Sequence, residues 1–435
     1  MSSRDLRDGV CAESDPRGRY GDGPGMKIAL TGCRLVDGRG EDPLPDATIL
    51  LDGSRFAAVG PGVNTPVPAD ARVIDVAGRT VLPGLIDLHV HTTFYYYRRD
   101  ATVHGKPYND PRIALVGVWH LEQLLEAGIT TVRDVASCGQ LVFDLKWGLG
   151  EGLIRGPRLW AAGPMIVPSG GHGTGFPELA REVNGVTAVR RAVREHVAAG
   201  ADLIKIGYLQ DEWTVEELEA AVDQAHRMNR KVACHVNYAP SITNALNAGV
   251  DSIEHGCLVT GPELEQMRDQ GTFWVVTSQI FREQFTECKA LAADPLAPRH
   301  VVASAQAQVR RHELIWDNMP GAIRRGTALG VNIGAGSDMF FPHVGIAALP
   351  LELASLVEIG LSPAEAIRAA TSSAAQCIGC QDELGTVEVG KLADLIVVDG
   401  DPLSDIGALQ EVLLVIKGGK VEKNVLNGRE SAGSS

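Results

Sequence analysis

Six ionisable side chains interrupt apolar stretches of this sequence, where each would be costly to bury unless it were paired, neutralised or bound to a metal. His89 and His91 lie two residues apart at the end of the run GLIDLHVH, so both imidazoles project from the same face of a strand. Lys205 lies in the middle of the run ADLIKIG. The other three end further apolar runs, and they are His235, His255 and Asp338. These residue types are typical of a metal centre.

Each of these residues also has an ordinary structural explanation. A histidine can be a core side chain with a backbone partner, Lys205 can extend its amine to solvent from the end of a strand, and Asp338 can cap a helix. Coincidence explains the whole set poorly, because the C-terminal ends of the strands are where barrel enzymes collect their catalytic groups. The set therefore favours a functional site over six separate structural roles.

Four imidazoles and a carboxylate suit Zn²⁺, with Mn²⁺, Fe²⁺ or Co²⁺ as alternatives. Burial favours the neutral amine of Lys205, which can take up CO₂ as a carbamate, and this anion can bridge two cations roughly 3.5 to 4 Å apart. A water held between two such cations becomes a hydroxide that attacks an amide carbonyl. Asp338 is placed to accept the proton of that water and to pass it to the leaving amine.

The elements that must position these residues alternate between apolar runs and helical patterns. Helix signals include the capping sequence from Thr214 to Glu217 and the terminal Gly249. The predicted strands are GLIDLHVH, TTVRDV, RLWAAGP, ADLIKIG, KVACHV, SIEHG, TFWVVTS and VNIGAGSD. Buried strands joined by crossover helices form a parallel sheet, and eight of them predict an α/β fold, a (β/α)₈ TIM barrel over residues 83–384.

Both ends of the chain are rich in short β runs broken by turn signals such as Asp37-Gly38 and Asp52-Gly53. We expect residues 26–82 to form an antiparallel β unit and to pair with residues 385–425 in a small β-sandwich. Residues 1–25 are expected to be a flexible leader, and residues 426–435 a polar C-terminal tail.

Composition narrows the function classes. The chain has 435 residues and a net charge of −14, from 40 Lys and Arg against 54 Asp and Glu. This balance argues against nucleic-acid or anionic-membrane partners, because both require a basic surface. No apolar run reaches the roughly 18 residues that a membrane span needs, and the first 25 residues lack the apolar stretch of a signal peptide. We therefore expect a cytoplasmic protein.

Several motifs, taken in order, resemble those of the amidohydrolase superfamily over roughly residues 26–416. They are VLPGLIDLHVH, GITTVRDV, GADLIKI, a histidine at a strand end, AGVDSIEHG, GSD and the closing segment AATSSAAQCIGCQDELGTVEVGKLADLIVVDGDPL. The resemblance implies a barrel with a β-sandwich and a binuclear centre held by the six residues above, with Lys205 carboxylated. Lys205 separates the chain from mononuclear relatives that lack this lysine, such as imidazolonepropionase and cytosine deaminase.

Within the superfamily the chain looks most like the imidazolonepropionase-related metal-dependent dipeptidases, which include prolidases and ochratoxin amidases. His172, in the segment Ser169–Gly173, matches a Gly-Gly-His of relatives that reaches the substrate. Tyr238 matches a tyrosine that relatives place near the scissile carbonyl, where a phenol can donate to a developing oxyanion. The ordinary alternatives are a solvated histidine in a glycine-rich loop and an aromatic ring covering a helix start.

The loops around the site depart from the dipeptidase pattern. The segment after Lys205, IGYLQDEWTVEEL, is shorter than in the prolidase-like group, which reshapes the substrate pocket. Two loops are aromatic, TTFYYYRRD and MFFPHVG, and an aromatic or apolar acyl group would suit them. Tyr95, Tyr96 and His343 are the substrate-binding candidates there, and a hydrophobic lid or dimer contact is the alternative.

Together these features predict a metal-dependent hydrolase acting on carbon–nitrogen bonds, peptide bonds or others. The expected substrate is a small molecule: an N-acyl amino acid, a dipeptide or a cyclic amide. The same site residues could also serve decarboxylation, deamination, or carbamate or ester hydrolysis in a specialised metabolic pathway, because fold and site type do not fix the reaction. An inactive scaffold is disfavoured, since all six ligands are present. Barrel enzymes of this kind are expected to form homo-oligomers.

Overall fold

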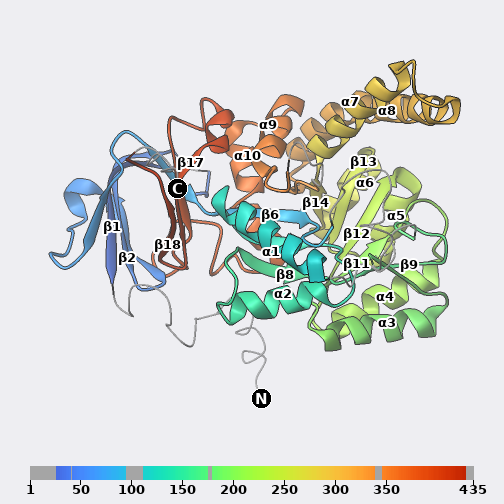
Figure 1. The fold of residues 1–435 in the computed structure, drawn as a ribbon, viewed down its shortest axis with the longest axis horizontal. Helices are drawn as coiled ribbons and strands as arrows, with labels where there is room; N and C mark the ends of the chain where they lie inside the picture. Colours follow the sequence, from blue (N-terminus) through green and yellow to red (C-terminus); the bar gives the residue numbers. More distant parts are fainter. Residues whose placement is uncertain (1–25, 41, 95–110, 175–178, 339–344, 428–435) are drawn as a thin grey trace.

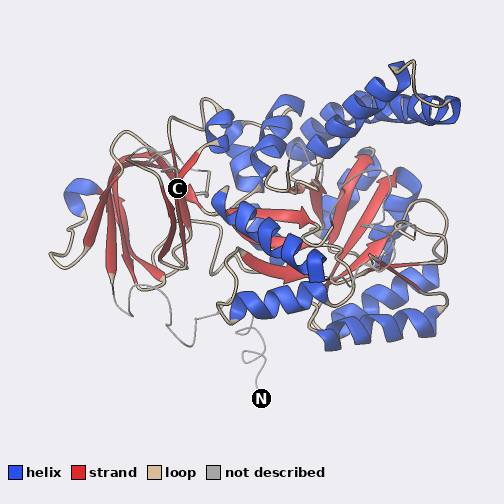
Figure 2. Cartoon of the chain, in the orientation of Figure 1, coloured by secondary structure: helices blue, strands red, loops and turns tan. Residues whose placement is uncertain are grey.

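The computed structural model describes residues 26–40, 42–94, 111–174, 179–338 and 345–427. One sheet built from both ends of the chain lies beside a larger body of parallel strands and helices (Figure 1). The candidate ligands predicted above all belong to the larger body. Helices flank its parallel strands, as Figure 2 shows.

Within the described residues, the sheet at the chain ends contains eight strands. Its strands run in the order β18-β17-β16-β5-β1-β2-β3, and β4 pairs with β1. Their bounds are β1 Lys27–Leu35, β2 Leu44–Asp52, β3 Arg55–Pro61, β4 Arg72–Asp75, β5 Thr80–Pro83, β16 Leu395–Val398, β17 Val412–Lys417 and β18 Lys420–Asn424. The two ends meet where β16 pairs antiparallel with β5, Ile396 opposite Leu82. In contrast to the antiparallel expectation for residues 26–82, β4 and β5 both run parallel to β1.

All eight predicted barrel strands are present, in two parallel sheets. One sheet has the order β6-β7-β8 and the other β10-β9-β11-β12-β13-β14-β15. Their bounds are β6 Leu85–Val90, β7 Ile129–Asp134, β8 Arg158–Ala161, β9 Met165–Val167, β10 Ala180–Glu182, β11 Leu203–Gly207, β12 Lys231–Tyr238, β13 Ser252–Leu258, β14 Phe273–Val276 and β15 Asn332–Ala335. The short strands β9 and β10 were not predicted.

Backbone hydrogen bonds link these two sheets at both edges. The Asp202 amide, just before β11, donates to the Ala161 carbonyl at the end of β8 over 2.9 Å. At the other edge, the Asp338 amide beyond β15 donates to the His89 carbonyl in β6 over 2.8 Å. The larger body is therefore an α/β arrangement of parallel strands whose first and last members lie next to each other.

The helices connect the parallel strands and continue beyond them. They are α1 Pro111–Glu126, α2 Leu141–Gly150, α3 Val186–Ala199, α4 Val215–Arg227, α5 Ala239–Ala248, α6 Gly261–Gln270, α7 Ser278–Ala293, α8 Arg299–Leu329, α9 Leu349–Ile359, α10 Pro363–Ala369 and α11 Ser372–Ile378. The predicted capping box is present at α4, where Thr214 and Glu217 bond each other's backbone amides. Gly249 ends α5 in the left-handed conformation, also as predicted.

Helices α7 and α8 lie side by side and project from the body as the gold arm of Figure 1. Among the described residues, no helix is both long enough and apolar enough to cross a bilayer.

Candidate metal centre

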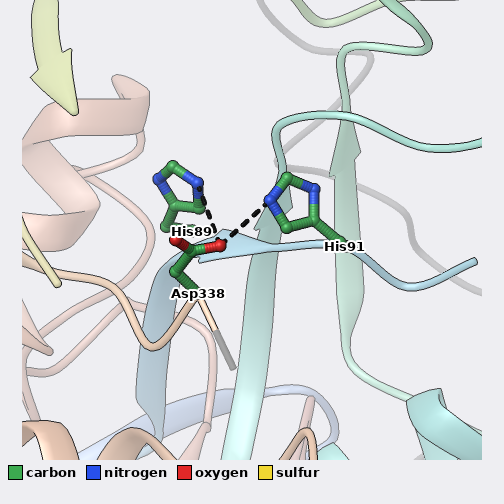
Figure 3. Close-up of side chains that lie close together, drawn as sticks. All are labelled: His89, His91 and Asp338. Atoms are coloured by element: carbon green, nitrogen blue, oxygen red, sulfur yellow. Dashed lines mark ion pairs between the residues drawn. The ribbon is translucent and has the colours of Figure 1, made fainter. Parts of the chain in front are cut away.

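The six predicted ligands all lie within parallel strands or just beyond their C-terminal ends. His89 lies near the end of β6 and His91 directly follows this strand, and Asp338 comes three residues after β15. The ligand atoms of these three residues all lie within 4.8 Å of one another, and Figure 3 shows the Asp338 carboxylate between the two imidazoles. One oxygen, Oδ1, lies 3.1 Å from His91 Nε2 and 3.6 Å from His89 Nε2.

His235 and His255 lie outside this compact group of three and adjoin it through ring contacts. The His255 ring centroid lies 4.8 Å from that of His89 and 4.4 Å from that of His235. The His172 ring stacks on the His235 ring at 3.8 Å with an interplanar angle of 16°. The structure therefore brings all five imidazoles into one continuous row with His172 at its end, and the role of His172 in contacting the substrate stays a prediction.

Outer hydrogen bonds orient three of these imidazoles. His89 Nδ1 lies 2.8 Å from Glu254 Oε2, His91 Nδ1 lies 2.7 Å from the Ala136 carbonyl, and His255 Nδ1 lies 2.7 Å from Thr277 Oγ1. A neutral imidazole that donates from Nδ1 keeps the lone pair of Nε2 for a metal, which is the usual arrangement of histidine ligands. At His235 the contact is with Nε2, from Asn237 Nδ2 at 3.4 Å, so Nδ1 is the nitrogen left for a metal there.

The electrostatics of the site favour neutral imidazoles. Burial lowers the pKa of His89, His235 and His255 well below its usual range, and the nearby positive charge of Lys205 lowers each of them further. Burial, with Lys205 next, lowers the pKa of His172 to about 4. His91 differs, because the Asp338 carboxylate outweighs burial and raises its pKa. Neutral imidazoles are the form that binds metal ions.

The surroundings of Lys205 indicate whether the predicted ligands fit a metal centre. Its side chain is only 2% exposed, and its Nζ has no hydrogen-bond partner within the described part of the chain. Burial lowers the pKa of Lys205 to about 8, which makes the neutral amine accessible near neutral pH. A buried amine without a partner is costly, whereas a carbamate formed on it would be an anionic metal ligand. The residues present therefore fit a metal centre.

Backbone strain occurs at two of the predicted ligands. His255 has φ = 69° and Asp338 has φ = 46°, in the left-handed region that residues other than glycine seldom adopt. Such a conformation costs on the order of 1–3 kcal/mol and is typical of functional sites. Gly336, two residues before Asp338, is also required, because a Cβ there would overlap the His89 side chain. The segment after β15 is thus built to present Asp338 to His89 and His91.

Four buried ionisable residues beside the ligands escaped the sequence-based prediction. They are Asp87, Arg133, Asp134 and Glu254. All four lie in predicted strands, so the rule that identified the ligands, an ionisable residue inside an apolar strand, would also have found them. Glu254 accepts hydrogen bonds from both His89 and Arg133, while Asp134 accepts them from Thr92. Their contacts indicate that they orient the ligands rather than contact a substrate.

The predicted substrate contacts are only partly described. Tyr238 is the last residue of β12 and is half-buried, and its ring stacks on none of the described histidines. Tyr95, Tyr96 and His343 lie outside the described residues. Phe94, from the same aromatic segment as Tyr95, is buried with its ring 6.5 Å from that of His91, so at least this aromatic side chain lies beside the centre.

Comparisons with known proteins agree with this geometry. The model of the amidohydrolase family matches residues 80–422. Ochratoxinase from Aspergillus niger is 29% identical over 433 residues, covering 89% of this chain and 85% of the relative. A solved Xaa-Pro dipeptidase with bound methionine in the active site has a TM-score of 0.81 and 30% identity, covering 92% of this chain and 100% of the other. A prolidase complexed with N-methylphosphonate-L-proline has a TM-score of 0.77 and 29% identity, with the same coverage.

These matches confirm the resemblance to prolidases and ochratoxin amidases that the motifs indicated. Members of the family are generally metal-dependent, and the group of His89, His91 and Asp338 is a candidate metal site of that kind. The chain belongs to the amidohydrolase family and is a hydrolase that acts on carbon–nitrogen bonds.

Proposed function

We propose that the chain is a binuclear metal-dependent amidohydrolase that cleaves an amide bond of a small molecule: an N-acyl amino acid, a dipeptide or a cyclic amide. The observation that carries this proposal is the buried amine of Lys205, which has no partner among the described residues and lies near neutral imidazoles. Carboxylation would turn this amine from a costly isolated group into a bridging ligand.

The proposed ligands of the two divalent cations are His89, His91, His235, His255, Asp338 and carboxylated Lys205. Zn²⁺ is the proposed metal, with Mn²⁺, Fe²⁺ or Co²⁺ as alternatives, because nitrogen ligands dominate the set. When bound, the cations would polarise the amide carbonyl and lower the pKa of water.

The residues of the chain supply the remaining steps. Asp338, held between His89 and His91, accepts a proton at its carboxylate and returns it to the leaving nitrogen. Tyr238 donates its phenol hydrogen to the carbonyl oxygen as negative charge develops there. His172, kept neutral by burial, contacts the substrate from the end of the row of imidazoles. Tyr95, Tyr96 and His343 are the proposed contacts of the acyl group.

We also propose that the two parallel sheets close into a (β/α)₈ barrel over residues 83–384. The hydrogen bonds from Asp202 to Ala161 and from Asp338 to His89 support closure at both edges. The sheet shared by β5 and β16 supports a β-sandwich domain of residues 26–82 and 385–425. A cytoplasmic location, a homo-oligomeric assembly and the leader and tail segments stay predictions from the sequence.

The relatives support the substrate class. One has methionine in its active site, and another binds a phosphonate linked to proline. The phosphonate is tetrahedral, like the carbonyl carbon of an amide during hydrolysis. We therefore propose that this chain also accepts a substrate with an amino acid on the nitrogen side of the amide.

The test combines metal analysis with turnover of N-acyl amino acids, dipeptides and cyclic amides. We expect about two metal ions per chain and metal-dependent hydrolysis that a chelator abolishes. Asp338→Asn is the matched variant, because asparagine tolerates the left-handed conformation found there. We expect it to keep the unfolding temperature and to lose about 10²- to 10⁴-fold in kcat. A metal-free wild type, or an Asp338→Asn variant of undiminished activity, would contradict the proposal.

A further inference from the structure

A half-buried cation in the α7–α8 arm has no role in the site described so far. Arg311 lies in α8 and is half-buried. Its guanidinium makes no hydrogen bond or ion pair with any residue that the structure describes, although the chain carries an excess of acidic residues. Arginines of comparable burial, such as Arg155 and Arg190, pair with carboxylates. An unpaired guanidinium in such a position therefore indicates that an anionic ligand binds there.

Helix α8 places Arg311 beyond the ends of the strands. The helix runs antiparallel to β13. Gly326, near the end of α8, packs against Trp274, which lies opposite Ile253 near the start of β13. Asn318, earlier in α8, contacts the C-terminal end of the same strand. Asn318 Nδ2 donates to the carbonyls of Cys257 and Val259, each over 3.1 Å. Because each residue advances a helix by about 1.5 Å, Arg311 lies roughly 10 Å further along α8, past the C-terminal end of β13.

The face of α8 that carries Arg311 is the face that packs on the body. Residues four and seven positions apart share one face of a helix. Ile315, four residues after Arg311, is 1% exposed, and Asn318, seven residues after it, makes the contacts with β13. Arg310 is exposed, and its side chain projects about 100° around the helix axis from that of Arg311, so it faces away from the body.

Side chains around Arg311 connect this face to the candidate metal centre. The neighbouring His312 is buried against Phe281 of α7, with ring centroids 6.2 Å apart. The Phe281 ring in turn lies edge-on to the His255 ring at 5.8 Å. The charge of Arg311 also interacts with His172 and with Cys257, two residues after His255. The guanidinium therefore lies on the same side of the molecule as the row of imidazoles.

We infer that Arg311 binds a carboxylate group of the substrate, an inference that rests on the proposed hydrolysis of an N-acyl amino acid or dipeptide. The planar guanidinium offers parallel donors that match the two oxygens of a carboxylate. The carboxylate is either the α-carboxylate of the leaving amino acid or the side-chain carboxylate of an acidic residue. Arg311 would act as a binding and specificity residue, not as a catalytic one.

The experiment compares Arg311→Gln with wild type, both loaded with metal, on three substrates. N-acetyl-glutamine against its α-amide isolates the α-carboxylate, and N-acetyl-glutamate against N-acetyl-glutamine isolates the side-chain carboxylate. We expect Arg311→Gln to lower kcat/KM by about 10- to 100-fold, mainly through KM, for substrates that carry the recognised carboxylate. Its effect on the matched substrate without that group should be less than about 3-fold, and Arg311→Lys should recover part of the loss.

Arg310→Gln is the control, because it removes an equal charge from the exposed side of the same helix. It should leave the hydrolysis of all three substrates unchanged. An equal loss with every substrate, or no loss with Arg311→Gln, would overturn the inference while leaving the proposed hydrolysis intact.

A second readout separates this inference from the proposed function. Thermal shifts of wild type, Arg311→Gln and Arg310→Gln are measured with glutamate, glutamine and glutaminamide as product-like probes. Stabilisation of wild type by the probe with the recognised carboxylate, and its loss in Arg311→Gln but not in Arg310→Gln, supports the carboxylate site even if no substrate is hydrolysed. Identical shifts for wild type and Arg311→Gln would refute it.

Discussion

Replacing Glu254 with glutamine should both destabilise the fold and weaken metal binding. The Glu254 side chain is completely buried and accepts two hydrogen bonds from Arg133, at 2.7 and 2.8 Å, besides its contact with His89. An amide cannot accept both bonds from Arg133 and also orient His89. Leaving a buried charge without its partner costs about 3–5 kcal/mol, a large part of the roughly 5–15 kcal/mol by which a domain is stable.

The loss of metal affinity has a separate physical origin. The Glu254 carboxylate fixes the orientation and the tautomer of the His89 ring, and loss of such an outer partner typically weakens metal binding by about 10- to 100-fold. A double variant, Arg133→Met with Glu254→Gln, separates the two effects. It should recover much of the stability, because the unpaired cation is gone, but it should not recover the metal affinity.

The assay combines urea unfolding of the metal-free protein with titration of Zn²⁺ against a competing chelator. Glu265→Gln serves as the control, because Glu265 pairs with Arg325 on the surface, where an ion pair contributes at most about 1 kcal/mol. If Glu254→Gln unfolds within about 0.5 kcal/mol of wild type and binds Zn²⁺ equally well, the reasoning about this network is wrong.

Two further predictions concern the surroundings of the centre. Gly336→Ala should destabilise the protein by about 1–3 kcal/mol and weaken metal binding, because the added methyl group would overlap His89. The control is Gly321→Ala in α8, where the added methyl group meets open space. In the same unfolding and metal titrations this variant should be neutral or slightly stabilising. Burial lowers the pKa of His120 below 6.5, so the unfolded chain binds a proton that the folded chain does not, and stability should rise with pH from the folded pKa to about 6.5. His120→Gln should lose this part of the pH dependence of unfolding, and an unchanged slope would show that the proton is taken up elsewhere.

The strands and their ligands were predictable from the sequence because their signals are local. An apolar run that ends in histidine, such as the one containing His89, identifies both a buried strand and its polar end. The helix boundaries at Thr214 and Gly249 depend on capping groups within a few residues, and the structure confirms both. The strands β9 and β10 were missed because three residues each are too few to show a period.

The outer partners of the ligands depend on distant pairings that a single sequence does not reveal. Glu254 and Arg133 are 121 residues apart along the chain, and they make contact only because β7 and β13 belong to the same body of parallel strands. Arg311 reaches the side of the centre only through the course of α8, which the sequence-based analysis did not identify as a helix. The chemistry of single residues was therefore predictable, whereas the neighbours that tune this chemistry required the structure.

Because β5 pairs with β16, the sheet next to the candidate metal centre can be completed only late in translation. Only Gly84 separates β5 from β6, the strand that carries His89, and a side chain at Gly84 would overlap Thr130. During translation β5 emerges long before β16, so the edge of β5 that does not pair with β1 has no partner until nearly the whole chain has left the ribosome. Pairing over such a distance is slow, and an open strand edge invites aggregation. A nascent chain halted before residue 395 would therefore leave the strand of His89 and His91 attached to an unfinished sheet.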